Sequence, residues 1–218
     1  MPPWSRWPRC PGPSRWAVGP GRASGWRPRS RSGPSTHSKP GREGRRPVDT
    51  ALTPPPFALQ VGASVTDAEL ATLLDEVFVE AGHTSPHVAA RLFAPDRVRA
   101  RGTLIAAREP GTGVLLGMVI LVAPGAASRQ IARDDEAEFH LLAVHPEARG
   151  RGIARALVDA GLQLARTRGW SRLVLSTQPQ MTGAQSLYAG AGFVRAPDRD
   201  WSSPTSRYLA FTLQLEAA

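Results

Sequence analysis

The residues His145-Pro-Glu-Ala-Arg-Gly-Arg-Gly-Ile-Ala154 decide how the rest of this chain is interpreted. They join an alternating apolar segment, which is typical of a strand, to a segment whose apolar residues recur at helical spacing. Two glycines at alternate positions free backbone N–H groups at the start of that helix, where the helix dipole favours anions. Arg149 and Arg151 add positive charge. The stretch therefore predicts a phosphate-binding turn between a strand and a helix.

Two well-known phosphate motifs do not fit this stretch. No Gly-Lys-Ser or Gly-Lys-Thr follows it, which excludes a Walker loop, and Arg155 stands where the third glycine of a dinucleotide fingerprint belongs. The alternative is that the stretch binds no ligand, and that Gly150 and Gly152 only allow a tight turn between the strand and the helix.

The hydrophobic periodicity predicts alternating strands and helices from residue 57 onward. Thr66 with Glu69 forms a capping box, and Pro86 stands at the first position of a second helix. The expected elements are a strand at 57–61, helices at 67–82 and 86–95, strands at 103–107, 114–122 and 138–144, a helix at 152–168, a strand at 173–175, a helix at 182–191 and a strand at 207–215.

The order of these elements indicates the fold class. The turn-rich segment 109–113 joins its two strands as an antiparallel hairpin, whereas the later strand, helix, strand unit favours parallel pairing. The sequence therefore predicts an α/β fold of the α+β mixed-sheet kind, with a central mixed sheet flanked by helices. On the strand at 138–144, simple alternation places Glu138, His140, Leu142 and Val144 on one face and Phe139, Leu141 and Ala143 on the other.

Charge divides the chain near residue 46. Residues 1–46 hold 11 basic side chains and one acid, whereas residues 47–218 hold 16 basic and 17 acidic side chains. The first segment is rich in Pro, Arg, Gly and Ser and cannot bury enough apolar surface to offset the entropy of ordering, so we expect a disordered basic tail. The alternatives are an Arg/Trp arm that binds single-stranded nucleic acid and a disordered leader, for example one that arises from a start codon assigned too far upstream. Residues 47–218 are expected to form one domain.

The cysteine count and the hydropathy of the chain bear on its cellular compartment. Cys10 is the single cysteine, which excludes an intrachain disulfide framework and a cysteine-rich metal site in the folded part. The longest strongly apolar run, at 114–123, has ten residues, whereas a membrane span needs about 20. Residues 1–46 lack the apolar stretch of a secretory signal. We expect a cytoplasmic protein, monomeric or homodimeric, with no membrane partner.

The chain resembles the GNAT superfamily of acyl-CoA-dependent N-acyltransferases. The resemblance spans residues 137–193 in motif and extends from about residue 56 to the C-terminus in element order. The segments that carry it are Leu141-Leu-Ala-Val144, His145-Pro146, Arg149-Gly-Arg-Gly-Ile-Ala154 and Leu187-Tyr-Ala-Gly-Ala-Gly-Phe193. Arg149, Gly152 and Ala154 meet the family pattern Q/R-x-x-G-x-G/A. A register two residues earlier fits Gly150 and Gly152 but places Glu147 at the Q/R position.

This resemblance implies a GNAT-like fold with acetyl-CoA as the acyl donor. The pantetheine arm is expected between two splayed central strands, with the pyrophosphate on the loop. The implied cofactor contacts are Leu142, Ala143, Val144, Arg149, Gly150, Arg151, Gly152, Ile153 and Ala154. Many members carry an asparagine seven residues before the tyrosine of the last helix, where this chain has Met181, so that contact is not expected. The surrounding segment 176–182 looks like the corresponding loop of certain bacterial subfamilies.

The implied reaction is transfer of an acetyl group to a primary amine by direct attack on the thioester. The amine must lose its proton before it attacks, and the leaving thiolate must gain one. Tyr188 is similar to the family tyrosine that commonly supplies this proton; without that role it packs the last helix. Glu138 stands where some members place a general base, acting directly or through water, and His140 is the reserve candidate. The alternative class is a non-catalytic acyl-CoA-binding regulatory or interaction domain.

No motif identifies the acceptor, so small amines, antibiotics, amino acids and peptide N-termini stay open. Asp198, Asp200 and Trp201 either line a pocket for a cationic amine or, in the case of Asp200, form a surface pair with Arg199. His83 and His87 are four residues apart, but a helix begins between them, so a metal pair is not expected.

Overall fold

The computed structural model describes residues 56–216, and the predictions for the tail at 1–46 lie outside this range. The strands are β1 Ala58–Val61, β2 Thr103–Arg108, β3 Leu115–Val122, β4 Ala137–Val144, β5 Arg172–Thr177, β6 Val194–Arg195, β7 Trp201–Ser202 and β8 Arg207–Gln214. The helices are α1 Asp67–Leu74, α2 Pro86–Leu92, α3 Pro95–Arg99, α4 Ile153–Thr167 and α5 Thr182–Gly190. A π-helix, η2, spans Asp75–Glu80, and short 3-10 turns are η3 Pro146–Ala148 and η4 Pro197–Arg199. Each strand and helix that the periodicity predicts is present.

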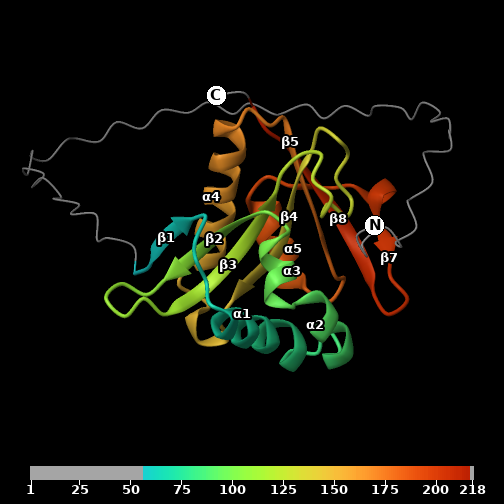
Figure 1. Cartoon of the computed structure of the whole chain (residues 1–218). Coiled ribbons are helices and arrows are strands. Elements are labelled where there is room, and N and C mark those ends of the chain that lie inside the picture. The colour runs from blue at the N-terminus through green and yellow to red at the C-terminus, as the bar shows by residue number, and fades with distance from the viewer. Residues whose placement is uncertain (1–55, 217–218) are drawn as a thin grey trace, which may run out of the picture. The chain divides into compact units, whose positions relative to one another are not determined.

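The strands form one mixed sheet in the order β1-β2-β3-β4-β5-β8-β6, with β7 paired to β8 (Figure 1). The β4–β5 pair is parallel, and the other pairs of the described chain are antiparallel. The parallel pair arises because the chain crosses over through α4 before β5 begins. The predicted mixed sheet is therefore confirmed.

Helices cover both faces of this sheet, and each face has its own apolar core. Figure 1 shows α4 behind the sheet and α1, α2 and α3 in front of it. The core on the α4 side includes Phe139, Leu157, Leu175, Tyr188 and Phe211. The core on the α1 side includes Leu70, Leu73, Leu74, Val98, Met118, Ile120 and Val122. The centre of β4 is therefore covered on both sides.

Two helical features differ from the prediction. The first helix is α-helical only to Leu74 and continues as the π-helix η2, a rare form that occurs mostly as short insertions near functional sites. Pro95 is predicted to lie near the end of the second helix, but α2 ends at Leu92 and Pro95 begins α3. A proline suits the first helical position because the N–H that it lacks would have no helical partner there.

The capping box of α1 also carries a partly buried charge contact. The Glu69 N–H donates to the Thr66 hydroxyl at 3.2 Å, and the Thr66 N–H donates back to the Glu69 carboxylate at 2.8 Å. Arg108 of β2 donates to the same carboxylate at 2.6 Å. The Arg108 hydrogen bond, with those from Thr66, lowers the pKa of Glu69 from 4.5 to about 2. The carboxylate therefore stabilises the fold in its ionised form.

Replacing Glu69 by glutamine is expected to lower the free energy of unfolding by about 1 to 2 kcal/mol at pH 7. Because the folded-state pKa is the lower one, this stabilisation is complete above pH 4.5 and is lost as the pH falls towards 2. Urea unfolding of wild type and Glu69→Gln across that range measures the difference. Exposed Glu80→Gln is the control, and a loss that does not shrink with acid would contradict the assignment.

A close approach between α4 and β4 requires glycine at position 161. A Cβ placed on Gly161 would lie 2.5 Å from Cζ of Phe139, whose ring is buried in the core. We expect Gly161→Ala to destabilise the fold by about 1 to 3 kcal/mol, because the ring must shift within a packed core. Gly183 of α5 has nothing within 4 Å of such a Cβ, so Gly183→Ala should be neutral or stabilising. Thermal unfolding compares the two, and equal shifts would disprove the contact.

Candidate active site

A bulge interrupts β4 where it begins to part from β5. Between the pairs Ile120↔His140 and Met118↔Ala143, β4 has two residues where β3 has one. Leu141, the first of the two, has a φ of 51°, in the left-handed region that L side chains rarely adopt. Holding a leucine there costs about 1 kcal/mol or more, and such strain clusters at functional sites.

Beyond the bulge the faces of β4 are exchanged, which corrects the alternation predicted from the sequence. Glu138 and His140 pair with residues of the α1-side core and stay on that face. From the bulge onward, Leu142 and Val144 pack against the α4-side core. Leu141 and Ala143 pack against the α1-side core. One inserted residue shifts a period of two by one position, so the predicted grouping of Leu142 and Val144 with Glu138 is wrong.

The strands β4 and β5 separate after a short parallel contact. Their pairs are Ala137↔Leu173, Glu138↔Val174 and Phe139↔Leu175. From His140 to Val144, β4 has no strand partner on its β5 side. An extended ligand can therefore hydrogen-bond this edge as an added strand would. The splay of the central strands that the family resemblance implies is therefore present.

The loop after β4 leads directly into α4. Gly150 has a φ of 77°, and Gly152, the residue that caps the start of α4, has a φ of 80°. Both positions suit glycine because other residues are strained at positive φ. The first N–H groups of α4 have no acceptor within the helix, so they point at whatever lies before it. A Cβ on either glycine would meet nothing within 4 Å, so the space beside the loop is open.

The two arginines of this loop are placed differently. Arg151 donates to the Glu109 carboxylate at 3.0 Å and to the Pro56 carbonyl at 2.7 Å. Its side chain therefore ties the loop to the turn between β2 and β3. Arg149 is exposed and has no ion pair within residues 56–216. Of the two guanidinium groups, that of Arg149 is available to a phosphate.

Tyr188 lies on α5 with its ring buried in the α4-side core. Its ring centroid lies 5.9 Å from that of Phe193 and 6.3 Å from that of Phe211. Arg155 of α4 holds the end of this helix by donating to the Gly190 carbonyl at 3.1 Å. The Tyr188 hydroxyl has no hydrogen-bond partner in the described part of the chain. Burial raises the pKa of this phenol well above its ordinary value, so it keeps its proton at neutral pH.

Glu138 is fully buried, and hydrogen-bond donors surround its carboxylate. The backbone N–H groups of Gln130, Ile131 and Ala132 donate to Oε2 at 2.8, 3.2 and 3.2 Å. Burial raises the pKa of Glu138, but the neighbouring His140 and the N–H donors outweigh burial, so the net direction is down. The ionised carboxylate therefore holds the loop between β3 and β4 against the sheet.

His140 is the first residue of β4 past the pairs with β5. It is 6% exposed, and its Nε2 lies 3.2 Å from Oε1 of Glu138, outside hydrogen-bond alignment. Within residues 56–216 its Nδ1 has no hydrogen-bond partner. Arg101 is also buried, donates to the Leu92 carbonyl at 2.7 Å and acts electrostatically on Glu138. Burial lowers the pKa of Arg101 to about 10. All three side chains are buried, and Glu138 interacts with each of the other two.

The segment after β6 is held by ion pairs. Asp200 accepts hydrogen bonds from Arg195 at 2.9 Å and from the Ala210 N–H at 2.8 Å. Burial raises its pKa, but these bonds outweigh burial and the net direction is down. Arg199 pairs at 2.6 Å with the buried carboxylate of Glu136. The Arg199–Asp200 surface pair considered from the sequence is therefore wrong, and Asp200 is already paired within the chain.

The other two candidates for an acceptor pocket have different surroundings. Asp198 is exposed within η4. Trp201 stacks on Tyr208 with ring centroids 4.1 Å apart and planes at 8°. Because Tyr208 alternates with core residues of β8, this stack lies on the face of the sheet opposite α4.

Two contacts that the sequence does not indicate join one segment to both splayed strands. Glu76 of η2 lies 2.6 Å from Nδ1 of His145, directly after β4. Gln178, directly after β5, donates to the His83 carbonyl at 2.9 Å. The segment 76–83 therefore bridges the separated ends of β4 and β5. No local pattern reveals this bridge, because the partners are far apart in the chain.

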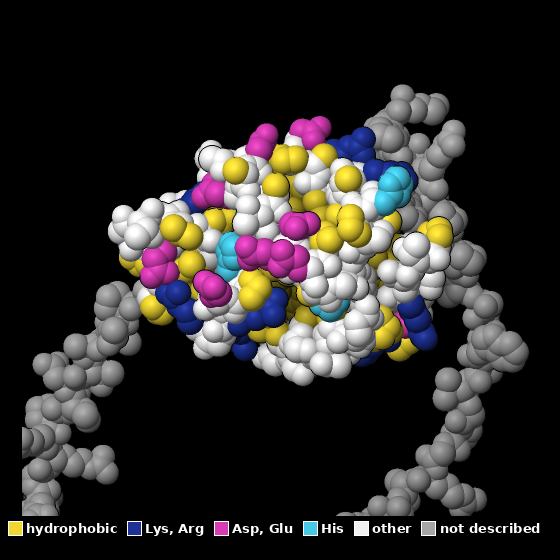
Figure 2. All heavy atoms as spheres, turned by 90° about the horizontal axis from the view of Figure 1, so that it is seen from below, with side chains coloured by type: hydrophobic (Ala, Val, Ile, Leu, Met, Phe, Trp, Pro, Cys, Tyr) yellow, Lys and Arg dark blue, Asp and Glu magenta, His cyan; other side chains and the backbone are white. Residues whose placement is uncertain are grey.

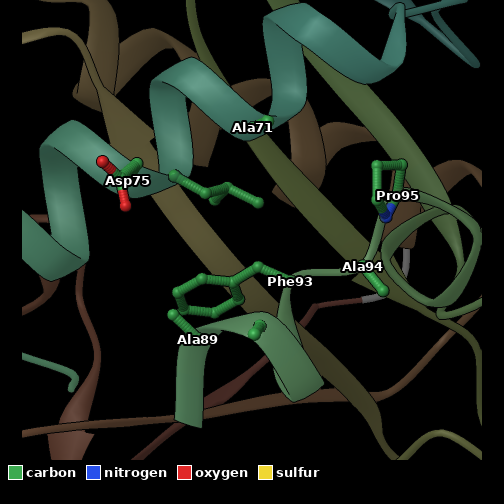
Figure 3. A pocket seen from close by; sticks show the side chains of 8 residues that line it. Ala71, Asp75, Ala89, Phe93, Ala94 and Pro95 are labelled. Atoms are coloured by element: carbon green, nitrogen blue, oxygen red, sulfur yellow. The ribbon is translucent and has the colours of Figure 1, made fainter. Parts of the chain in front are cut away.

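A shallow hollow of about 260 Å³ lies between α1 and α2 (Figure 3). It is lined by Ala71, Leu74, Asp75, Ala89, Ala90, Phe93, Ala94 and Pro95. None of the residues predicted for the cofactor or for catalysis lines it. Figure 2 shows acidic side chains gathered near the middle of the face seen from below. Residues 67–80, which form α1 and η2, contain five acids and no lysine or arginine.

Within residues 56–216 no group of three or more His, Cys, Asp or Glu side chains is arranged to hold a metal ion. In the same range no helix is both long enough and apolar enough to cross a membrane.

Comparison with known proteins relates these features to one family. The family model described as the acetyltransferase (GNAT) family matches residues 68–193, more than half of the chain. Mycothiol acetyltransferase from Beutenbergia cavernae is 36% identical over 85 residues, which make up 39% of this chain and 26% of that protein. N-acetyltransferase 8B from Rattus norvegicus is 51% identical over 55 residues, 25% of this chain and 24% of that protein. The chain thus matches about a quarter of the length of these curated relatives.

Solved structures share the architecture at low sequence identity. An acetyltransferase from Bacillus subtilis in complex with CoA gives a TM-score of 0.53 at 18% identity, covering 73% of this chain and 99% of that one. The ribosomal-protein-S18-alanine N-acetyltransferase from Escherichia coli gives 0.51 at 19% identity, covering 74% and 96%. The central mixed sheet flanked by helices is therefore the fold of the GNAT acyl-CoA N-acyltransferases.

Proposed function

Because the chain belongs to the acetyltransferase (GNAT) family, we propose that it transfers an acetyl group from acetyl-CoA to a primary amine by direct attack on the thioester. The observation that carries the proposal is the junction of β4 with α4. There β4 parts from β5 after Phe139, and a loop with two glycines at positive φ follows at once. The free strand edge suits a pantetheine arm, and the loop N–H groups suit a pyrophosphate.

The cofactor contacts of this proposal are mainly backbone groups. Leu142, Ala143 and Val144 offer the free edge of β4, and the loop from Gly150 to Ala154 offers its N–H groups. Ile153 and Arg151 act through the backbone, because one side chain is in the core and the other is paired with Glu109. Arg149 adds its free guanidinium. Bound acetyl-CoA supplies the electrophilic carbonyl carbon, and an N–H of the strained bulge supplies a donor for the developing oxyanion.

Two protons must move for the acetyl group to pass to an amine. Tyr188 is proposed as the acid for the thiolate, because its phenol stays protonated and its hydroxyl has no partner within residues 56–216. The base is proposed on β4, where Glu138 and His140 lie on the face covered by α1 to α3. The ammonium form of an amine has no lone pair, so this base sets the pH range of the reaction.

The acceptor is proposed as a primary amine without further identity. Asp75 and Glu80 of η2 have no ion pair within residues 56–216, and their charge would attract a cation towards the side of the sheet on which Glu138 and His140 lie. The names mycothiol acetyltransferase and ribosomal-protein-S18-alanine N-acetyltransferase differ in what they specify, so no single acceptor transfers to this chain. The cytoplasmic location and the monomeric or homodimeric state stay predictions from the sequence.

Calorimetric titration of acetyl-CoA into the full-length chain, followed by thiol release with a panel of primary amines, tests the proposal. We expect micromolar binding and amine-dependent release of free CoA. Binding without release from any amine would support the non-catalytic acyl-CoA-binding domain instead. A folded protein that fails to bind acetyl-CoA would overturn both assignments.

A further inference from the structure

The two candidate bases on β4 are not equivalent in their surroundings. Glu138 is buried without measurable exposure, and three consecutive N–H groups, from Gln130 to Ala132, donate to one of its oxygens. Those donors stabilise the ionised form, and they enclose the carboxylate on the side of the β3–β4 loop. A carboxylate held in this way takes a proton reluctantly, so Glu138 is a poor direct base for an incoming amine.

His140 has the properties that Glu138 lacks. It follows the last β4–β5 pair, at the point where the strands open, and it precedes the strained Leu141. In the described chain neither ring nitrogen of His140 has an aligned hydrogen-bond partner, although the residue is 94% buried, and Nδ1 has no carboxylate beside it either. Leaving a buried imidazole nitrogen unsatisfied costs about 1 to 3 kcal/mol, and such groups in native structures call for a functional explanation.

The carboxylate also favours a proton on one imidazole nitrogen over the other. Nε2 of His140 lies 3.2 Å from Oε1 of Glu138, outside hydrogen-bond alignment, and both side chains are buried. A proton on Nε2 is attracted to the carboxylate, which leaves the lone pair on Nδ1. Arg101, in the turn before β2, interacts electrostatically with Glu138, which favours the ionised carboxylate. The arrangement therefore favours the tautomer of His140 whose Nδ1 can accept a proton.

We propose that His140 takes the proton of the acceptor ammonium through Nδ1, and that Glu138 is a positioning residue that orients its ring. This inference rests on the proposed acetyl transfer and assigns the base within it. The ammonium gives one proton to His140, and the neutral nitrogen then forms the C–N bond as the C–S bond breaks. The thiolate takes a proton from Tyr188. The nitrogen then loses its second proton, which restores the phenol of Tyr188. His140 returns its proton to solvent, so one proton is released per turnover.

The kinetic test compares two nucleophiles at saturating acetyl-CoA. A primary alkylamine arrives protonated at neutral pH, whereas hydroxylamine arrives neutral and has no ammonium proton to lose. We expect His140→Gln to lower kcat/KM for the alkylamine about 100-fold and for hydroxylamine less than about 5-fold. Exposed His87→Gln on α2 is the matched control and should leave both rates unchanged. Equal losses with both nucleophiles, or no loss with either, would overturn the assignment.

Acetyl-CoA affinity separates this inference from the proposed function. Calorimetry on His140→Gln should give an affinity within about threefold of wild type, because the loop after β4 is untouched. If wild type fails to bind acetyl-CoA, the proposed function itself falls. If wild type binds and turns over but His140→Gln does so equally well, only the inference falls.

A spectroscopic test needs no acceptor. Imidazole ¹⁵N resonances of the full-length protein report the tautomer of each histidine, and we expect His140 to carry its proton on Nε2. Glu138→Gln should abolish that preference and lower alkylamine turnover about 10-fold, with acetyl-CoA affinity retained. Glu76→Gln, which removes the carboxylate beside His145 instead, is the matched control and should leave the His140 signals in place. A His140 proton on Nδ1 in wild type would contradict the positioning role.

Discussion

Replacing Tyr188 by phenylalanine is expected to lower turnover about 1000-fold, because the leaving thiolate loses its proton donor. The ring contacts with Phe193 and Phe211 remain in this variant. The lost hydroxyl has no hydrogen-bond partner within residues 56–216, so the free energy of unfolding should change by less than about 0.5 kcal/mol. Free CoA release with a primary amine measures the first quantity, and urea unfolding measures the second.

The control for this variant is the other tyrosine of the chain. Tyr208→Phe removes the same hydroxyl from β8, where the ring stacks on Trp201, and should leave turnover within about twofold. Acetyl-CoA affinity should be retained in both variants. If Tyr188→Phe turns over at the wild-type rate, the hydroxyl is not the acid, and Tyr188 serves only to pack α5 in the core.

The second large effect is expected in the loop that precedes α4. Changing both Gly150 and Gly152 to alanine should weaken acetyl-CoA binding several hundred-fold, as measured by calorimetry. The two Cβ atoms would enter the open space beside the N–H groups, and losing two charge-assisted hydrogen bonds costs roughly 3 to 4 kcal/mol. The apparent thermal stability should fall too, since alanine at positive φ is strained by about 1 kcal/mol per site.

A matched glycine separates backbone strain from cofactor contact. Gly169, at the far end of α4, has a φ of 70°, and a Cβ placed on it would meet nothing within 4 Å. In both respects it resembles Gly150 and Gly152. Gly169→Ala should therefore lose stability to a similar degree per site and keep wild-type affinity for acetyl-CoA. If the loop variant bound acetyl-CoA as tightly as Gly169→Ala does, the pyrophosphate would have to lie elsewhere.

Most of the fold was predictable because its signals are local. The capping box at Thr66 and Glu69 specifies a helix start through atoms three residues apart, and the structure contains both of its hydrogen bonds. Gly150 and Gly152 have no Cβ and can therefore adopt a positive φ without strain, and both do so in the structure. Alternation and helical spacing depend on neighbours within one or two turns, so the periodicity placed most strands and helices correctly, although it missed α3, β6 and β7.

The candidate site was predictable only in part. The loop, the splay and the position of Tyr188 follow from motif and element order. The environment of Glu138 does not, because the N–H groups that occupy its carboxylate belong to the irregular loop at 130–132. Met181 stands where many family members have an asparagine. Its sulfur accepts a hydrogen bond from the Thr177 hydroxyl at 3.5 Å, so this side chain interacts with the end of β5.

The sequence by itself determined the order and type of most elements, the mixed sheet and the glycine turn before α4, since these rest on residue type and short-range spacing. Only the tertiary structure decided where the bulge at Leu141 exchanges the faces of β4, that Arg199 pairs with Glu136, and that Glu76 and Gln178 bridge the splayed strands. The physical reason is the same in each case. A register or an ion pair is chosen by competition among all surfaces that meet in three dimensions, and no window of the chain contains both partners.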